Sequence, residues 1–185
     1  MNIIAETKRL TLRAWTDSDR AVFRAMNGDE QVMTHFPGVM SSRQADDLFE
    51  RELKRPQNTG FCAVEVTASG EIAGACGVYP ASVSGVVPEG AYEIGWRFIP
   101  SQWGQGYARE AGEAWLDIAF EKLGLDEVYA WTAETNKPSL AVMRRCGMER
   151  TRDLDFVHPD VPDKYPQLKK HLVCRLTKAQ WAAYK

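Results

Sequence analysis

The 185-residue sequence predicts a single α/β domain. Segments in which polar and apolar residues alternate are separated by segments whose apolar residues recur every three or four positions, the periods of strands and helices. A short turn with Gly104 and Gly106 joins an extended segment at 91–99 to a helical one at 107–122. No internal repeat or low-complexity linker divides residues 1–185, so we expect one domain over the whole range.

The composition excludes several classes of function. A formal net charge of −2 gives no support for nucleic-acid binding. No apolar run approaches the roughly 20 residues of a membrane helix, and the first residues lack the basic-then-apolar order of a secretion signal. We therefore expect a cytoplasmic protein that binds neither nucleic acid nor membranes.

The cysteines and histidines do not predict a metal site. Four cysteines lie far apart without a Cys-x-x-Cys motif, and the three histidines have no metal-ligand spacing. We expect buried free thiols and no metal.

The first segments predict a strand and then a helix. Residues 9–14 alternate between polar and apolar side chains, as in a strand with one face on the core. Thr16 and Asp19 are spaced as a capping pair. A short helix should therefore run to about Met26, where Asn27-Gly28 breaks it.

A second helix is expected after an irregular segment at 29–40. Ser41 and Gln44 form a capping box, and the apolar residues that follow recur with helical spacing until Pro56.

The period then changes from helical to extended. Residues 61–67 and 71–79 predict an antiparallel hairpin, and 81–90 read as a loop. In the strand at 91–99, one face carries Tyr92, Ile94, Trp96 and Phe98, and the other carries Glu93, Gly95, Arg97 and Ile99.

The remaining segments alternate between helix and strand. Gly124 closes the helix at 107–122, and residues 128–132 form a strand. A helix follows from Asn136-Lys137-Pro138-Ser139 to Gly147. The strand at 171–176 leads into a short helix capped by Thr177.

The glycine turn predicts an anion site, because glycines let a ligand approach the backbone and a helix N-terminus has free N–H groups. A nucleoside-triphosphate loop would need Lys and then Ser or Thr after its second glycine, where Tyr107-Ala108 stands. A dinucleotide fingerprint would need Gly or Ala where Arg109 stands. The third interpretation is a site for the pyrophosphate of coenzyme A, held by successive backbone amides from Gly104 to Ala108.

Four motifs in this order resemble the GNAT acetyltransferases, most closely the branch of ribosomal-protein N-terminal alanine and serine acetyltransferases. The motifs are Leu10-Thr11-Leu12-Arg13, Glu93-Ile94-Gly95-Trp96, Trp103-Gly104-Gln105-Gly106-Tyr107-Ala108 and Asn136-x-x-Ser139-x-x-Val142 with Gly147-Met148. The resemblance covers about the whole chain. It implies an α+β fold whose central, mostly antiparallel mixed sheet is flanked by helices and splays open where acetyl-CoA binds.

The resemblance also implies coenzyme-binding residues. The backbone of Phe98 and Ile99 would pair with the pantetheine arm and the acetyl carbonyl at a bulge in the strand. Gly104, Gln105, Gly106, Tyr107 and Ala108 would hold the pyrophosphate, and Asn136 would be a polar residue on the coenzyme side.

Two residues are candidates for proton transfer. An amine bound as a cation needs a base, for which we nominate Glu93, acting through water. Many relatives have a tyrosine acid where this chain has Met143, so we nominate Ser139, which also matches a position near the coenzyme sulfur. Alternatively, neither residue transfers a proton: Glu93 is a surface carboxylate, and the Ser139 hydroxyl satisfies backbone groups in the first turn of the helix or contacts the coenzyme.

These observations predict an N-acetyltransferase that passes an acetyl group from acetyl-CoA directly to a primary amine. The acceptor is either a protein N-terminus or a small-molecule amine. The alternative is a non-catalytic acyl-CoA-binding or regulatory domain of the same fold. A monomer and a homodimer are both compatible with the sequence.

Overall fold

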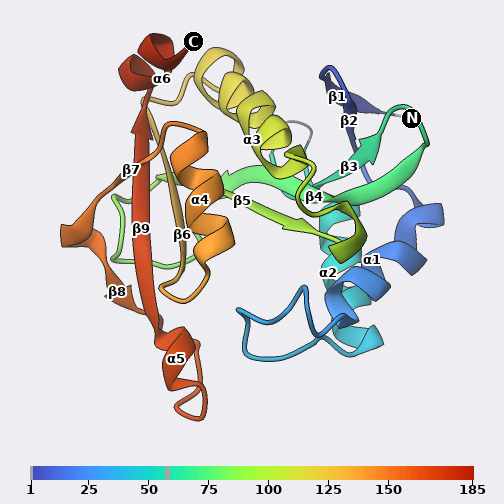
Figure 1. The fold of residues 1–185 in the computed structure, drawn as a ribbon, viewed down its shortest axis with the longest axis horizontal. Helices are drawn as coiled ribbons and strands as arrows, with labels where there is room; N and C mark the ends of the chain where they lie inside the picture. Colours follow the sequence, from blue (N-terminus) through green and yellow to red (C-terminus); the bar gives the residue numbers. More distant parts are fainter. Residues whose placement is uncertain (1, 57–58) are drawn as a thin grey trace.

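A computed structural model describes residues 2–56 and 59–185 of the chain (Figure 1). Its sheet has the strand order β1-β2-β3-β4-β5-β6-β9-β7, with β8 paired to β9. The strands are β1 (Ile3–Glu6), β2 (Leu10–Arg13), β3 (Cys62–Val66), β4 (Glu71–Pro80), β5 (Tyr92–Phe98), β6 (Glu127–Ala133), β7 (Glu149–Arg150), β8 (Phe156–Val157) and β9 (Lys170–Thr177). The helices are α1 (Arg20–Gly28), α2 (Ser42–Leu53), α3 (Tyr107–Asp117), α4 (Lys137–Arg145), α5 (Pro166–Lys169) and α6 (Lys178–Tyr184).

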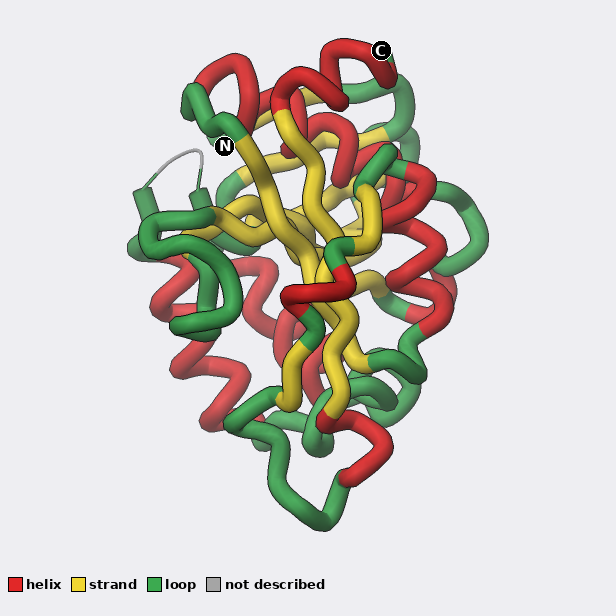
Figure 2. Tube along the Cα trace, turned by 90° about the vertical axis from the view of Figure 1, so that its left-hand side faces the viewer, coloured by secondary structure: helices red, strands yellow, loops and turns green. Residues whose placement is uncertain are grey.

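The sheet lies between two layers of helices. All its pairings are antiparallel except that of β5 with β6, which is parallel. Helices α1 and α2 cover one face, while α3 and α4 cover the other, and the strands run between the two layers (Figures 1 and 2). The α+β class and the mostly antiparallel mixed sheet are therefore confirmed.

Alternation along the strands divides the core into two layers. On β3, Cys62 and Val64 join the cluster around Trp115 of α3, whereas Ala63 joins the cluster around Phe49 of α2. The four cysteines are free and buried, as predicted. Among the described residues, no helix is both long and apolar enough to span a membrane.

The structure departs from the expected elements in several places. Strand β1 was not predicted, because Ile3–Glu6 does not alternate and is defined by its pairing with β2. Helix α1 continues through Gly28. The side-chain amide of Asn27 donates to the Phe23 carbonyl within the helix and does not interrupt it. The helix predicted over 107–122 becomes a π-helical turn at Ile118–Lys122. The short elements between β7 and β9 were not predicted either.

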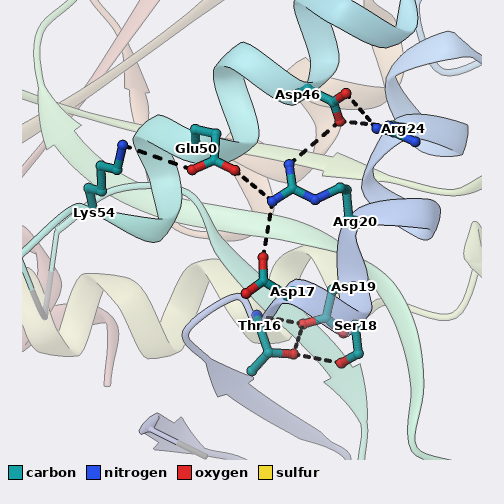
Figure 3. Close-up of polar contacts among 9 residues, drawn as sticks. All are labelled: Thr16, Asp17, Ser18, Asp19, Arg20, Arg24, Asp46, Glu50 and Lys54. Carbon is teal, nitrogen blue, oxygen red and sulfur yellow. Dashed lines mark hydrogen bonds and ion pairs between the residues drawn. The ribbon is translucent and has the colours of Figure 1, made fainter.

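Two groups of ion pairs attach α1 to the sheet and to α2. The buried Arg13 of β2 donates to both carboxylate oxygens of Asp19 at 2.7 and 2.9 Å and to Glu65 at 2.7 Å. Asp19 also accepts from the Thr16 amide at 2.8 Å, so the predicted capping pair is confirmed (Figure 3). At the more exposed α1–α2 contact, Asp46 of α2 pairs with Arg24 of α1 (Figure 3).

Replacing Asp19 by Asn should destabilise the protein by about 3 kcal/mol, because it leaves the buried Arg13 with a single carboxylate. Urea denaturation would measure the loss. The matched control is Asp46→Asn at the more exposed α1–α2 contact, which should cost less than about 1 kcal/mol. Equal losses for the two variants would contradict this account of α1.

Candidate active site

The sheet opens between β5 and β6. These strands are paired only at Tyr92 with Val128 and at Glu93 with Tyr129, although β5 continues to Phe98 and β6 to Ala133. The last five residues of β5 therefore have no strand on the β6 side. The divergence implied by the resemblance is present at this point.

The backbone of β5 determines which peptide groups face the opening. The Ile99 N–H donates to Ala73 of β4 at 3.0 Å, and the Ile99 carbonyl accepts from Gln102 at 3.0 Å. Because peptide groups of successive residues point to opposite edges of a strand, those of Trp96 and Phe98 point to the open edge.

A binding role for the Ile99 backbone would thus require its present hydrogen bonds to be exchanged. The expected bulge at Phe98 and Ile99, which would free these groups, is not present in β5. The β4–β5 register is continuous from Tyr92 to Phe98, and the irregularity lies instead in β4, where Ala73 is the extra residue against β3. The Phe98 carbonyl accepts from the Trp103 indole at 2.7 Å.

The glycine turn is open to a ligand. Gly104 and Gly106 have φ values of 75° and 82°, and a Cβ on Gly104 would meet nothing within 4 Å. Within residues 2–56 and 59–185, the N–H groups of Gly104, Gln105 and Gly106 have no acceptor. The first N–H groups of α3, at Tyr107 and Ala108, also have no partner within that helix. Such a set of free donors fits the pyrophosphate of coenzyme A.

A clamp from the β1–β2 hairpin holds this turn. Arg9 donates from Nη1 to the Gln105 carbonyl at 2.9 Å and from Nε to Glu110 at 2.7 Å. The guanidinium lies 4.8 Å from the centre of the Tyr107 ring. Glu110 also accepts from the Thr7 hydroxyl at 2.6 Å. Sequence reasoning missed the clamp because Arg9 and Glu110 are 101 positions apart.

Glu93 is a buried carboxyl on the β5 face away from α3, only 5% exposed. Ser82, in the loop before β5, donates from its hydroxyl to both carboxylate oxygens at 3.0 and 3.2 Å and from its amide at 3.3 Å. Burial raises the pKa of Glu93 to about 7, although the hydrogen bonds from Ser82 and Tyr79 oppose this rise. The surface-carboxylate alternative is therefore excluded.

Two further polar side chains lie on the same face. Tyr79 of β4 is opposite Glu93 in register, and its hydroxyl is 2.6 Å from where a Cβ of Gly95 would stand. Burial and the neighbouring Glu93 raise the pKa of Tyr79 well above its usual value, so the phenol stays protonated. Arg97 lies two residues beyond Gly95. The alternation placed Arg97 on this face, but its contacts could not be predicted from the sequence.

The start of α4 holds the other nominated residues. Asn136 caps the helix, accepting from the Ser139 amide at 3.2 Å and donating to the Thr132 hydroxyl at 2.9 Å. The Ser139 side chain is half-buried, and its hydroxyl has no partner within the described part of the chain. Met143 is buried in the core, 2% exposed.

The structure therefore brings the nominated residues together in three groups. Glu93 lies with Ser82 and Tyr79, the glycine turn lies against Arg9, and Ser139 lies beside Asn136 on the β6 side of the opening.

Comparisons with known proteins agree with this architecture. The acetyltransferase (GNAT) domain model matches residues 9–149. The uncharacterized N-acetyltransferase YnaD of Bacillus subtilis (strain 168) is 30% identical over 145 residues, which are 78% of this chain and 81% of that protein.

Solved structures show the same fold. A GNAT-family acetyltransferase from Bacillus anthracis has a TM-score of 0.77 and 22% identity, with 97% of this chain and 99% of that chain covered. A spermidine N-acetyltransferase from Vibrio cholerae, in complex with CoA and spermine, has a TM-score of 0.73 and 16% identity, with 95% and 99% covered. Since the family model spans most of the chain and the fold agrees with it, this protein belongs to the GNAT family of N-acetyltransferases, which use acetyl-CoA.

Proposed function

We propose that this enzyme transfers the acetyl group of acetyl-CoA directly to a primary amine, on a small molecule or at a protein N-terminus. The observation that carries the proposal is the position of Glu93, a buried carboxyl with a pKa of about 7 on the strand that borders the sheet opening. A carboxyl with this pKa is largely ionised just above neutral pH and is poised to accept a proton from an ammonium group. The N-terminal alanine and serine branch is supported by the sequence motifs.

The chain's own groups have distinct tasks in this reaction. Acetyl-CoA, when bound, supplies the thioester. The N–H groups from Gly104 to Ala108 hold its pyrophosphate, aided by the dipole of α3. The family resemblance implies that the backbone of Phe98 and Ile99 pairs with the pantetheine arm. The orientation of β5 favours Phe98, together with Trp96.

Proton transfer is assigned to two side chains on opposite sides of the opening. Glu93 takes the proton of the amine through water, and Ser82 keeps its carboxylate in place. The Ser139 hydroxyl donates to the departing thiolate, and its lack of a partner among the described residues leaves it available for this role. Asn136 positions Ser139 by accepting from its amide, and so acts on the coenzyme side through the start of α4.

Release of free thiol from acetyl-CoA across a panel of primary amines tests the proposal. We expect amine-dependent thiol release in the wild type and a rate at least about a hundredfold lower in Glu93→Gln, as for loss of a general base. The activity of the variant should shift to higher pH, because the acceptor must then lose its proton unaided. Coenzyme binding without turnover of any amine would favour the acyl-CoA-binding alternative, and an unchanged pH profile would remove Glu93 from the mechanism.

Replacing Ser82 by Ala should move the acidic limb of the kcat/KM profile to higher pH, by up to about one unit. The hydrogen bonds from the Ser82 hydroxyl favour the ionised carboxylate, so their loss raises the pKa of Glu93 above about 7, while the bond from the backbone amide of residue 82 is kept. Ser84→Ala, in the same loop, is the matched control and should leave the limb in place. A shift to lower pH would show that Ser82 does not stabilise the ionised form.

Replacing Gly106 by Ala should raise the KM for acetyl-CoA several-fold. The residue has a φ of 82°, where a Cβ costs about 1–2 kcal/mol, and that Cβ would stand 3.4 Å from Arg9 Nη2. Gly70, with a φ of 71° in the β3–β4 turn and nothing within 4 Å, offers a control with the same backbone strain. Gly70→Ala should lose similar stability and keep its KM. A raised KM in both variants would mean that backbone strain, and not a change in the glycine turn, weakens the binding of acetyl-CoA.

A further inference from the structure

Arg97 is a half-buried cation without a carboxylate partner. Its Nη1 donates to Oδ1 of Asn27, a fully buried residue of α1, and its guanidinium lies 4.5 Å from the centre of the Phe36 ring. Its Nε is buried and has no hydrogen-bond partner. No carboxylate among the described residues compensates this charge.

Comparison with Arg13 shows how unusual this environment is. Arg13, on β2, is more deeply buried, but it is held by the carboxylates of Asp19 and Glu65, whose hydrogen bonds raise its pKa despite burial. For Arg97, burial lowers the pKa to about 10. The nearby Tyr79 is a protonated phenol and provides no counter-charge. An uncompensated buried charge is strongly unfavourable, so Arg97 calls for an anion that the chain itself does not supply.

The position of Arg97 connects it with the acceptor side of the opening. It lies on the part of β5 that has no β6 partner, on the same face as Glu93, and four residues of extended strand separate the two by about 13 Å. The segment between α1 and α2, residues 29–41, contributes an aromatic ring that lies near the guanidinium. Phe36 covers the guanidinium, and the neighbouring His35 Nδ1 is 3.4 Å from the Thr135 hydroxyl beyond the end of β6.

The order of groups along this face is therefore a carboxyl at Glu93, the Tyr79 hydroxyl above Gly95, and the guanidinium of Arg97. An acceptor bound along the face would present its amine toward the carboxyl and a group of opposite charge toward the guanidinium.

We propose that the acceptor carries a carboxylate in addition to its amine, and that Arg97 binds this carboxylate. The inference rests on the proposed transfer to an amine and specifies the substrate class. Asn27 occupies Nη1, while the Nε–Nη2 edge has no partner in the described chain and is the edge of a guanidinium that pairs side-on with a carboxylate. Because Nε is buried, a ligand reaches this edge only if neighbouring atoms move, and the nearby Phe36 ring belongs to a turn segment and is itself 38% exposed.

The test compares amines that differ only in charge. The carboxylate acceptors are glycine, β-alanine, 4-aminobutyrate and 6-aminohexanoate, and each is paired with its primary amide. The series spans the amine-to-carboxylate distances that fit within about 13 Å of strand. We expect the wild type to favour at least one carboxylate over its amide by about tenfold or more in kcat/KM, as for a charged hydrogen-bonded pair. Equal turnover, or a preference for the amides, would overturn the inference.

Two variants separate binding from a structural role. Arg97→Gln should lower kcat/KM for the carboxylate at least about tenfold more than for its amide. Arg97→Lys keeps the charge but loses the paired N–H groups of the guanidinium, so its carboxylate-to-amide ratio should lie between those of the wild type and Arg97→Gln. Arg55→Gln is the control, since Arg55 is near the Tyr79 ring but already paired with Glu52. It should leave the carboxylate-to-amide ratio unchanged.

The outcomes distinguish this inference from the proposed function. A uniform loss for both acceptor types in Arg97→Gln would mean that Arg97 only supports the α1–α2 segment, and the proposed function would stand. If Arg97→Gln does not fold, the wild-type acceptor series and Arg97→Lys still decide the question. Absence of thiol release with every amine, despite coenzyme binding, would refute the proposed function itself.

Discussion

The early end of the β5–β6 pairing is the constraint on which the rest of the site depends. After two paired positions the strands diverge, and the remaining peptide groups of β5 lack the partners that a continuous sheet would give them. Buried peptide groups must be hydrogen-bonded, so an opening of this kind persists only where side chains, water or a ligand satisfy them. The Trp103 indole already satisfies one of these groups, at the Phe98 carbonyl. The rest make the edge suitable for an extended ligand such as the pantetheine arm.

In the proposed reaction, the opening separates a coenzyme side from an acceptor side with different chemistry. On the coenzyme side, the glycine turn offers backbone N–H groups, and its cation, Arg9, is neutralised by Glu110. The turn therefore offers a ligand backbone donors rather than a free cation. On the other face of β5, Glu93 and Arg97 are both partly or fully removed from water, and no partner within the described chain compensates Arg97. In the proposed reaction, charge complementarity with the acceptor would therefore have its largest effect on this side.

The sequence predicted most of the fold and the family. Alternation assigned the two faces of β5 correctly, and the capping boxes at Thr16, Ser41 and Thr177 are all present. It did not predict β1, β7 or β8, because their residues carry no periodic pattern and are defined by pairing with neighbouring strands. The roles given to the site residues, Ile99 among them, remain proposals.

The sequence by itself determined the family, the glycine turn and the residue types on each face of β5, since these depend on local spacing and backbone preference. Only the tertiary structure decided what surrounds those residues. Ser82 meets Glu93 from a loop, Arg9 reaches Gln105 across 96 positions, and Arg97 reaches Asn27 across 70. Whether a buried charge has a counter-charge depends on such long-range contacts. For this reason the raised pKa of Glu93 and the uncompensated charge of Arg97 could be recognised only in the folded chain.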